Sequence, residues 1–239
     1  MKKFKKLISY FSIGEVILWV ASVLLIIIPF LIFKGQGVLA MINSLIGVTA
    51  LIFCAKGNPI GQVLMIVFCV IYAIISLSFK YYGEMITYLF MSLPMAIVSL
   101  IAWLKNPFGE SKLEVKVNSL TKKETVFMFI LTAIVTIIFY FVLKFFNTAN
   151  LIPSTISIAT SFLAGYLIFR RIEYYALAYA LNDVVLIWLW ILATIKDFNY
   201  ISVVICFVVF LFNDLYGFIN WSKMKKRQQK HTKSKIQTE

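Results

Sequence analysis

The chain has 239 residues, of which 62% are hydrophobic and only 14% are charged, and its mean hydropathy is +0.92. Soluble globular proteins are about 45–50% apolar, so this composition excludes a large water-soluble catalytic domain and a disordered chain. Three cysteines, an odd number, exclude a fully paired disulfide scaffold. The net charge of +13 comes from Lys and Arg in short segments between long apolar runs, a distribution typical of membrane proteins rather than of nucleic-acid-binding proteins.

Eight apolar runs are long enough to cross a bilayer as helices. A hydrocarbon core about 30 Å thick requires about 20 apolar residues at 1.5 Å per residue. The runs cover residues 14–33, 38–55, 60–79, 84–104, 125–146, 152–169, 174–195 and 199–221. We therefore predict an all-α integral membrane protein with eight transmembrane helices.

Two of the predicted helices begin with a capping-box pattern. Ser12 is followed three residues later by Glu15, and Thr121 is followed by Glu124, so that each pair can satisfy free N–H groups of a first helical turn. The lysines before the first span resemble the start of a signal peptide. The apolar run is too long for one and no cleavage motif follows it, so we expect this span to be retained.

The basic residues separate by side of the membrane. With eight crossings, 19 of the 23 Lys and Arg residues fall on the side that holds both termini, and the other side has only Lys34, Lys80, Lys144 and Lys196. Because basic loops remain in the cytoplasm, we predict a multi-pass protein of the cytoplasmic (inner) cell membrane. Both termini are expected to be cytoplasmic.

Spans two to four and spans six to eight look like two copies of a three-helix unit, joined by span five. Leu51-Ile52-Phe53 precedes Lys56 at the end of one first helix, and Leu167-Ile168-Phe169 precedes Arg170 in the other. An even number of crossings separates the copies, so this 3+1+3 arrangement predicts parallel repeats related by an axis along the membrane normal. The alternative is that the tripeptide recurs by chance in so apolar a chain.

This interpretation divides the chain into five parts. They are a basic N-tail with an extra transmembrane helix (1–37), a first repeat (38–105), a cytoplasmic loop with a linker helix (106–150), a second repeat (151–222) and a basic cytoplasmic tail (223–239). We expect the basic tail to meet anionic lipid headgroups and not nucleic acid.

Two Asn-Asp pairs lie where the bilayer is expected. Asn182-Asp183 and Asn213-Asp214 are each about eight residues from the cytoplasmic end of a span, at matching depth in neighbouring helices. An Asp at a helix centre costs about 2.5–3.5 kcal/mol on insertion scales, so such residues usually face a bundle interior or a water-filled path. The pairs therefore indicate a substrate site, with helix-to-helix hydrogen bonding as the simpler alternative.

Aromatic and hydroxyl side chains extend this candidate site. Tyr175 and Tyr179 share a helical face with Asn182, and Tyr216 lies three residues from Asn213. Rings beside amides suit a flat heteroaromatic ring that carries a sugar. Further candidates from the first repeat are Tyr88, Ser92 and Gln62, and Pro94 is a helix break that could expose backbone to a cavity.

Motifs of enzymes and metal sites are missing from the sequence. The single histidine, His231, lies in the basic tail, and the three cysteines are isolated within apolar runs, so no familiar metal-ligand spacing occurs. Neither a phosphate-binding loop nor a nucleophile elbow is present. We expect no cofactor and no catalytic activity.

In chain order, several short motifs resemble the PnuC family of nicotinamide riboside transporters over residues 38 to 223, and the first span resembles an extra N-terminal helix of some members. The motifs are Lys56-Gly57-Asn58, Tyr82-Gly83-Glu84, Pro94, Trp103-Leu104-Lys105-Asn106, Arg171-Ile172-Glu173 and the segment from Asn213-Asp214 through Tyr216-Gly217-Phe218 to Asn220-Trp221.

The resemblance implies a bundle of parallel repeats like that of SWEET transporters. It also implies facilitated diffusion of a phosphate-free, nucleoside-like vitamin that is trapped by phosphorylation in the cytosol. The family's W-x-x-W-x-x-x-N substrate motif falls on Tyr175, Ala178 and Asn182, so the Asn is retained and the second Trp is lost. This departure leaves thiamine or another nucleoside as an alternative substrate.

The leading hypothesis is a passive importer of nicotinamide riboside. The alternatives are the membrane subunit of an energised vitamin importer and a proton-coupled carrier that uses Asp183 or Asp214. The expected partners are the small-molecule substrate and the lipid bilayer. The protein could form a homo-oligomer, and a cytosolic kinase is expected to act downstream without a required contact.

Overall fold

The computed structural model describes residues 10–33, 37–78, 81–109, 113–148 and 150–238. Within these ranges the regular elements are helices, and eight helical segments are long and apolar enough to cross a membrane. The elements are α2 (Ile13–Phe33), α3 (Val38–Ala55), α4 (Ile60–Ser78), α5 (Tyr82–Thr87), η1 (Tyr88–Ser92), α6 (Leu93–Lys105), α7 (Lys122–Phe145), α8 (Leu151–Phe169), α9 (Tyr175–Thr194), η2 (Phe198–Tyr200) and α10 (Ile201–Thr238). The prediction of an all-helical protein with eight spans is confirmed.

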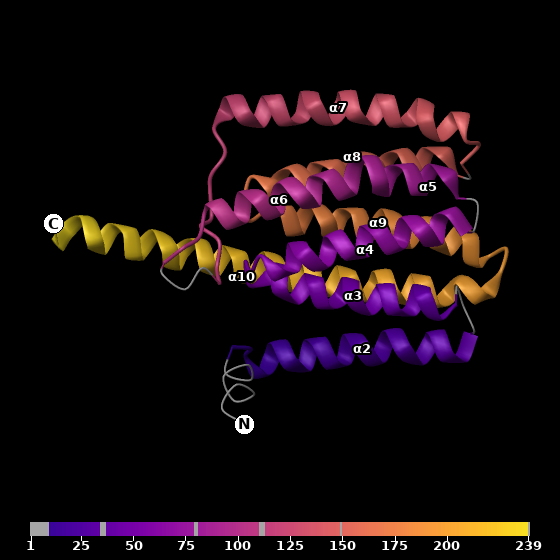
Figure 1. Ribbon diagram of the computed structural model, residues 1–239, viewed down its shortest axis with the longest axis horizontal. Helices are drawn as coiled ribbons and strands as arrows, with labels where there is room; N and C mark the ends of the chain where they lie inside the picture. Colours follow the sequence, from indigo (N-terminus) through magenta and orange to yellow (C-terminus); the bar gives the residue numbers. More distant parts are fainter. Residues whose placement is uncertain (1–9, 34–36, 79–80, 110–112, 149, 239) are drawn as a thin grey trace.

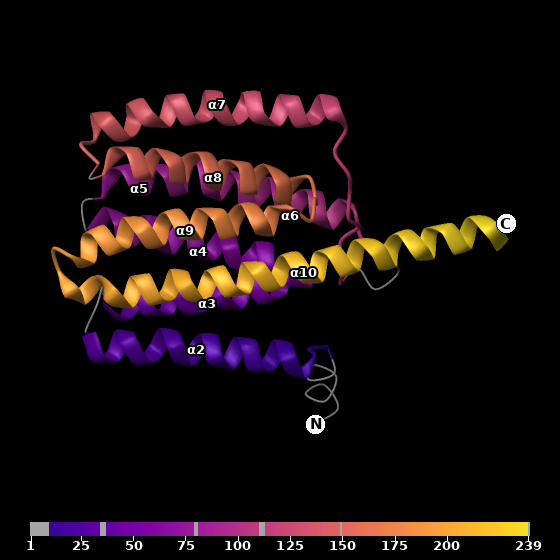
Figure 2. The same ribbon diagram turned by 180° about the vertical axis from the view of Figure 1, so that it is seen from behind.

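Six of the spans form a closed ring. Each of α3, α4, α6, α8, α9 and α10 contacts the next in that order, and α10 returns to contact α3. Figure 1 shows α3, α4, α5 and α6 on the near side, and Figure 2 shows α8, α9 and α10 on the opposite side. The two predicted triplets therefore lie against each other, and they meet where α6 contacts α8 and where α10 contacts α3.

The two remaining spans lie outside the ring at opposite edges of the bundle (Figure 1). α7 packs on α8 and touches α5, while α2 packs on α10 and α3. Each of these helices therefore covers one of the two seams between the triplets. α2 and α7 therefore occupy corresponding places at the two seams, and the 3+1+3 arrangement of parallel repeats stays a prediction.

The corners that follow α3 and α8 have the same construction. Gly57 (φ 66°) and Arg171 (φ 61°) both adopt the left-handed backbone conformation. The Gly57 N–H donates to the Cys54 carbonyl at 2.9 Å, and the Arg171 N–H donates to the Ile168 carbonyl at 3.0 Å. These bonds satisfy carbonyls at the two helix ends. This conformation is unstrained for Gly57 and uncommon for a residue with a side chain. Arg171 nevertheless adopts the same turn as Gly57.

Both predicted capping boxes are present, and each cap also binds a basic residue at one of these corners. The Ser12 N–H donates to Glu15 at 2.7 Å, and the Thr121 N–H donates to Glu124 at 3.0 Å. Glu15 forms an ion pair with Lys56 at 2.9 Å, and Glu124 forms one with Arg170. α2 and α7 therefore begin with similar caps and similar ion pairs.

Two indoles cross between the triplets. Trp103, near the end of α6, donates to the Ile168 carbonyl of α8 at 3.0 Å, and Trp221 of α10 donates to the Cys54 carbonyl of α3 at 2.8 Å. Both rings are fully buried and lie 5.5 Å apart, centroid to centroid. The pair of tryptophans therefore joins the triplets reciprocally at one end of the bundle.

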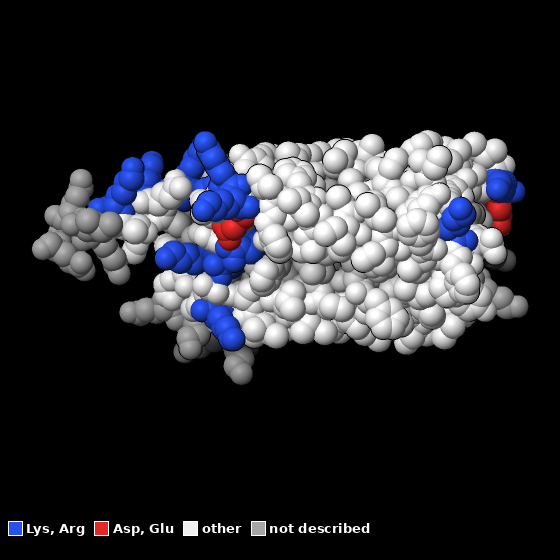
Figure 3. Space-filling model, turned by 90° about the horizontal axis from the view of Figure 1, so that it is seen from above, with Lys and Arg blue, Asp and Glu red and all other residues white. Residues whose placement is uncertain are grey.

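Charge is distributed unequally between the two ends. On the face shown in Figure 3, Lys and Arg side chains gather at the end from which α10 projects, few lie at the opposite end, and the surface between is uncharged. We call the first of these the basic end. This separation agrees with the distribution of Lys and Arg in the sequence, and the assignment of the basic end to the cytoplasm stays a prediction.

Two spans differ from their predicted forms. The fourth is interrupted by the π-helical turn η1, which ends two residues before Pro94, and proline supplies no N–H to the preceding turn. The eighth does not end at residue 221, because α10 continues as one helix to Thr238. The residues after Trp221 include strong helix formers and no Gly or Pro, and Lys225 forms an ion pair with Glu173 at 2.5 Å.

Candidate functional site

A narrow cavity of about 110 Å³ lies within the ring of six spans. Its lining comes from α3, α4, η1, α6, α8, α9 and α10, and the described residues of α2 and α7 contribute none of it. A space of this size holds several water molecules. The polar side chains that line it are Gln62, Tyr88, Ser92, Ser161, Tyr175, Tyr179, Asn182, Asp183 and Asp214.

Asn182 is held in one orientation by hydroxyl groups of α8. Its Oδ1 lies 3.0 Å from Ser157 Oγ, 2.8 Å from Thr160 Oγ1 and 3.0 Å from Ser161 Oγ. The amide oxygen is therefore satisfied by the protein, and among the described residues the amide nitrogen has no partner. Since Asn182 lines the cavity, it offers two N–H donors to an acceptor such as a carboxamide or sugar oxygen.

Asp183 of α9 and Asp214 of α10 are the two carboxyl groups of the cavity wall. Both side chains line the cavity, and both are 5% exposed. Asp183 Oδ2 is buried without a partner among the described residues. The cavity therefore contains an acidic pair, and the described residues that line it include no Lys, Arg or His.

Tyrosine rings bound the cavity on two sides. Tyr175 and Tyr179 of α9 are 6.2 Å apart and nearly perpendicular, and Trp221 contacts the ring of Tyr175 at 4.9 Å. Tyr88 lies on the π-helical turn, and its ring is tilted by 32° against that of Tyr72 at 4.1 Å, centroid to centroid. The aromatic faces are held by neighbouring rings, which suits them to pack against a flat ligand ring.

The remaining candidates from the first repeat also reach the cavity. Ser92 ends the π-helical turn, and Gln62 of α4 donates to Cys54 Sγ at 3.3 Å with its side chain only 2% exposed. The wide turn of η1 has the character of π-bulges, which are frequent at functional sites.

Asn213 and Tyr216 do not line the cavity. Asn213 Nδ2 donates to Ser22 Oγ of α2 at 2.9 Å, and Tyr216 donates to Glu15 Oε1 at 2.8 Å. Successive helical residues point about 100° apart, so Asp214 faces the cavity while Asn213 faces α2. The expectation that these two residues belong with Asn182 is therefore corrected. They attach the first span to α10.

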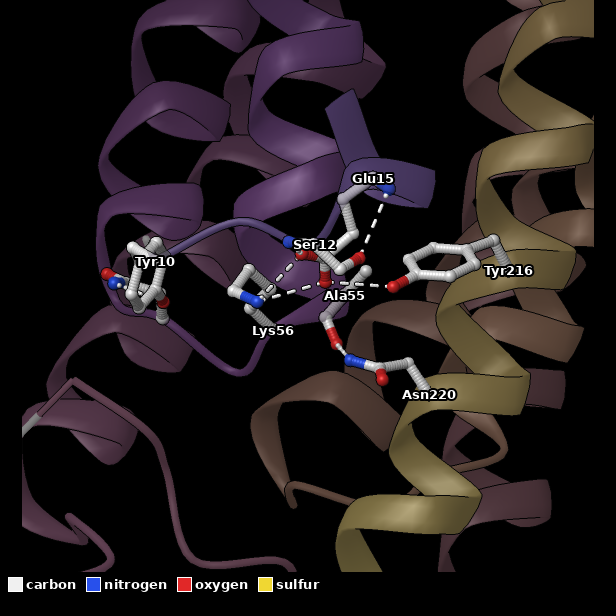
Figure 4. A network of polar contacts seen from close by, with 8 residues as sticks. Tyr10, Ser12, Glu15, Ala55, Lys56, Tyr216 and Asn220 are labelled. Atoms are coloured by element: carbon white, nitrogen blue, oxygen red, sulfur yellow. Dashed lines mark hydrogen bonds and ion pairs between the residues drawn. The ribbon is translucent and has the colours of Figure 1, made fainter. Parts of the chain in front are cut away.

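Figure 4 shows the contact between Tyr216 and Glu15 at the basic end of α2. Lys56 Nζ lies 2.9 Å from each carboxylate oxygen of Glu15, and it also lies over the ring of Tyr10 at 4.7 Å. Glu15 is only 3% exposed, and with Lys56 and Tyr216 around it, it joins α2, the corner after α3 and α10.

The profile of the family described as "Nicotinamide mononucleotide transporter" matches residues 37–223, which includes every described residue that lines the cavity. The chain belongs to this nicotinamide mononucleotide transporter family. Its α2 precedes the matched region.

Two curated relatives of this family member are named nicotinamide riboside transporter PnuC. The protein from Neisseria mucosa is 28% identical over 201 residues, which are 82% of this chain and 76% of the relative. The protein from Haemophilus influenzae is 26% identical over 197 residues, 79% of this chain and 81% of the relative. The predicted membership of the PnuC family is confirmed.

The fold agrees with a solved structure described as the vitamin B3 transporter PnuC. The TM-score is 0.78 at 23% sequence identity, and the match covers 91% of this chain and 94% of the other. As a member of the nicotinamide mononucleotide transporter family, the chain is a multi-pass membrane transport protein for a small molecule and not an enzyme.

The hydroxyl groups that orient Asn182 in this transporter were not predicted. Ser157, Thr160 and Ser161 follow the i, i+3, i+4 spacing of one helical face, a signal that was available in α8. The sulfur-containing side chains of the cavity wall were not predicted either, because isolated Cys and Met residues do not stand out in so apolar a chain. These residues are Cys54, Met65, Cys69, Met91 and Met95.

Proposed function

We propose that this protein imports nicotinamide riboside by facilitated diffusion. The names of its relatives supply the substrate class, and one structural observation supports the choice of the riboside. The described residues that line the cavity include two carboxyl groups and no basic side chain. A phosphate group would be desolvated there without a counter-charge, so the site favours the riboside over the mononucleotide.

The described contacts suggest how the substrate would be bound. Asn182 presents free N–H donors for the carboxamide or the ribose, while Tyr88, Tyr175 and Tyr179 pack around the ring. Ser92, Gln62 and the two carboxyl groups complete the polar contacts. Exchange between the two sides of the membrane would come from rocking of one triplet against the other around this site.

Facilitated diffusion only equalises the substrate concentration on the two sides of the membrane. We propose that phosphorylation in the cytosol removes the free substrate and so drives further import. The phosphorylated product cannot return through a cavity without basic residues. No contact between the kinase and this chain is required. In this proposal the protein lies in the inner membrane with its basic end, and so both termini, in the cytoplasm. It works either alone or as a homo-oligomer.

The decisive test is uptake of radiolabelled nicotinamide riboside by liposomes that contain the purified protein alone. We expect the internal concentration to equal the external one, and to rise further only when a riboside kinase and ATP are enclosed. Empty liposomes and nicotinamide mononucleotide are the controls. No uptake without an added ATPase would instead indicate a subunit of an energised importer, and accumulation that follows an imposed pH gradient would indicate obligatory proton coupling.

Thiamine remains the second candidate substrate, because Ala178 stands where the family motif has a second Trp. A calorimetric titration of the detergent-purified protein with nicotinamide riboside, thiamine and a deoxynucleoside compares the candidates directly. Tighter binding of thiamine would replace the riboside as the proposed substrate.

A further inference from the structure

The acidic pair Asp183 and Asp214 has a chemical role that hydrogen bonding to an uncharged substrate does not explain. We propose that this pair is the counter-charge for a substrate with a permanent positive charge, and that the pair releases one proton when the substrate binds. The inference rests on the proposed function, because nicotinamide riboside carries its charge on the ring nitrogen that is bonded to the sugar.

The first argument is that two carboxyl groups share one small buried space. Asp183 and Asp214 both line the cavity, each is 5% exposed, and the described residues of the wall include no Lys, Arg or His. Two carboxylates placed in this way are not both ionised without a compensating charge. Without substrate, the pair therefore carries one proton and one negative charge.

The second argument is an unsatisfied acceptor. The Asp183 side chain lines the cavity and is only 5% exposed. Its Oδ2 has no partner among the described residues. A buried carboxylate oxygen without a donor is costly. A cationic ring in the cavity would satisfy it.

The third argument is the sign of charge along the cavity. A smaller space adjoins it at Tyr88, Ser92 and Ser161, and Glu84 lies in the wall of that space. The charged side chains among the described residues that line either space are Glu84, Asp183 and Asp214. Because all three are acidic, both spaces attract cations and repel anions.

The surrounding titratable groups leave the proton to the acidic pair. The other such groups in the cavity wall are phenols and thiols from α3, α4, η1 and α9, which ordinarily lose their protons only above neutral pH. They are Cys54, Cys69, Tyr88, Tyr175 and Tyr179. On α10, Cys206 lines a separate small space that shares Phe207 and Phe210 with the cavity wall. When a cation enters and one proton leaves, the net charge of the site is unchanged.

The test is calorimetric titration of the full-length, detergent-purified protein at pH 5.5, 6.5 and 7.5, in buffers with different ionisation enthalpies. The ligands are nicotinamide riboside, its uncharged 1,4-dihydro form and thiamine, whose thiazolium ring is also permanently charged. We expect release of about one proton per riboside bound, and affinity that increases up to about tenfold per pH unit. The dihydro form should bind more weakly and without proton release.

Two variants localise the effect. In Asp183→Asn and Asp214→Asn we expect proton release to disappear and the preference for the charged over the uncharged riboside to fall at least tenfold. Asp197→Asn is the matched control, because Asp197 lies in the turn before η2 and outside the cavity. If either cavity variant fails to fold, the comparison of charged and uncharged ligands on the unaltered protein still decides.

The outcomes separate the two proposals. Tight binding of nicotinamide riboside without proton release, or equal affinity for its charged and uncharged forms, overturns the role of the acidic pair and leaves the proposed function in place. Binding of thiamine but not riboside, with proton release, overturns the proposed substrate and supports the acidic pair. Binding of none of the three ligands overturns both.

Discussion

Trp103 donates its indole N–H to the backbone carbonyl of Ile168 at 3.0 Å, and so the end of α6 in one triplet is bonded to α8 in the other. The mirror contact runs from Trp221 to Cys54. In each case the indole reaches a carbonyl near a helix end, where backbone acceptors lack intrahelical partners. Contacts of this kind allow two triplets to be held together at the basic end while their other parts adjust.

The indole contacts predict a specific loss of stability. Trp103→Phe and Trp221→Phe retain an aromatic ring and remove the donor. We expect each to destabilise the protein by about 0.5–1.5 kcal/mol, because one buried hydrogen bond is lost while the carbonyl keeps its bond to the Arg171 or Gly57 N–H. Thermal unfolding in detergent measures the effect. Trp188→Phe is the control, since Trp188 is 49% exposed; an equal loss in the control would show that ring size and not the hydrogen bond matters.

Asn182 and Asn213 should respond differently to the same substitution. We expect Asn182→Ala to weaken substrate binding by about tenfold or more, because its donors face the cavity, and to leave insertion and folding intact. Asn213→Ala should leave affinity within about twofold and lower the melting temperature, because Asn213 joins α10 to Ser22 of α2. Calorimetry and thermal unfolding of both variants provide the comparison. Unchanged affinity in Asn182→Ala would remove this residue from the site.

The two equivalent ion pairs should differ in strength. Glu15 is 3% exposed beside Lys56, whereas the side chain of Glu124 beside Arg170 is 32% exposed. Because removal of one partner leaves a half-buried Lys56 without its counter-charge, Glu15→Gln should cost about 1–3 kcal/mol. Glu124→Gln should cost less, since solvent screens an exposed pair. Similar melting temperatures for the two variants would contradict this ranking.

The predicted orientation can be tested with introduced cysteines. The native Cys54, Cys69 and Cys206 are all buried, so they give little background with a membrane-impermeant thiol reagent. In intact cells we expect labelling of Ile195→Cys, at the end with few basic residues, and no labelling of Thr232→Cys until the membrane is opened. The reverse pattern would place the basic end outside.

The spans could be predicted from the sequence because lipid imposes a length and a polarity on each of them. Residues outside the bilayer are not subject to this constraint. The continuation of α10 beyond Trp221 could therefore not be predicted from the hydropathy pattern. The π-helical turn from Tyr88 to Ser92 was indicated only indirectly by Pro94, because its form depends on how the freed backbone groups are satisfied by neighbouring helices.

The residues that face the cavity could be predicted from the sequence more easily on α9 than on α10. Asn182 and Asp183 face the cavity as expected, because few other roles justify polar residues at that depth. On α10 the pattern of polar residues could not distinguish the cavity from the surface covered by α2. Tyr216 and Asn213 are one helical turn apart on the α2 side, and only the position of the first span determines which side that is.

The uninterrupted course of α10 from Ile201 to Thr238 (Figure 1) has a practical consequence. Beyond Trp221 the helix extends about 25 Å, so a change of about 10° in its tilt would displace its tip by about 4 Å. On this extension, the Gln228 side chain donates to the Val115 carbonyl at 3.0 Å. The loop between α6 and α7, which contains Val115, would therefore move with the helix. A spin label on the projecting part of α10 should therefore move farther than the membrane-spanning part of the helix. It would report from aqueous solution a rearrangement that takes place deep in the bilayer.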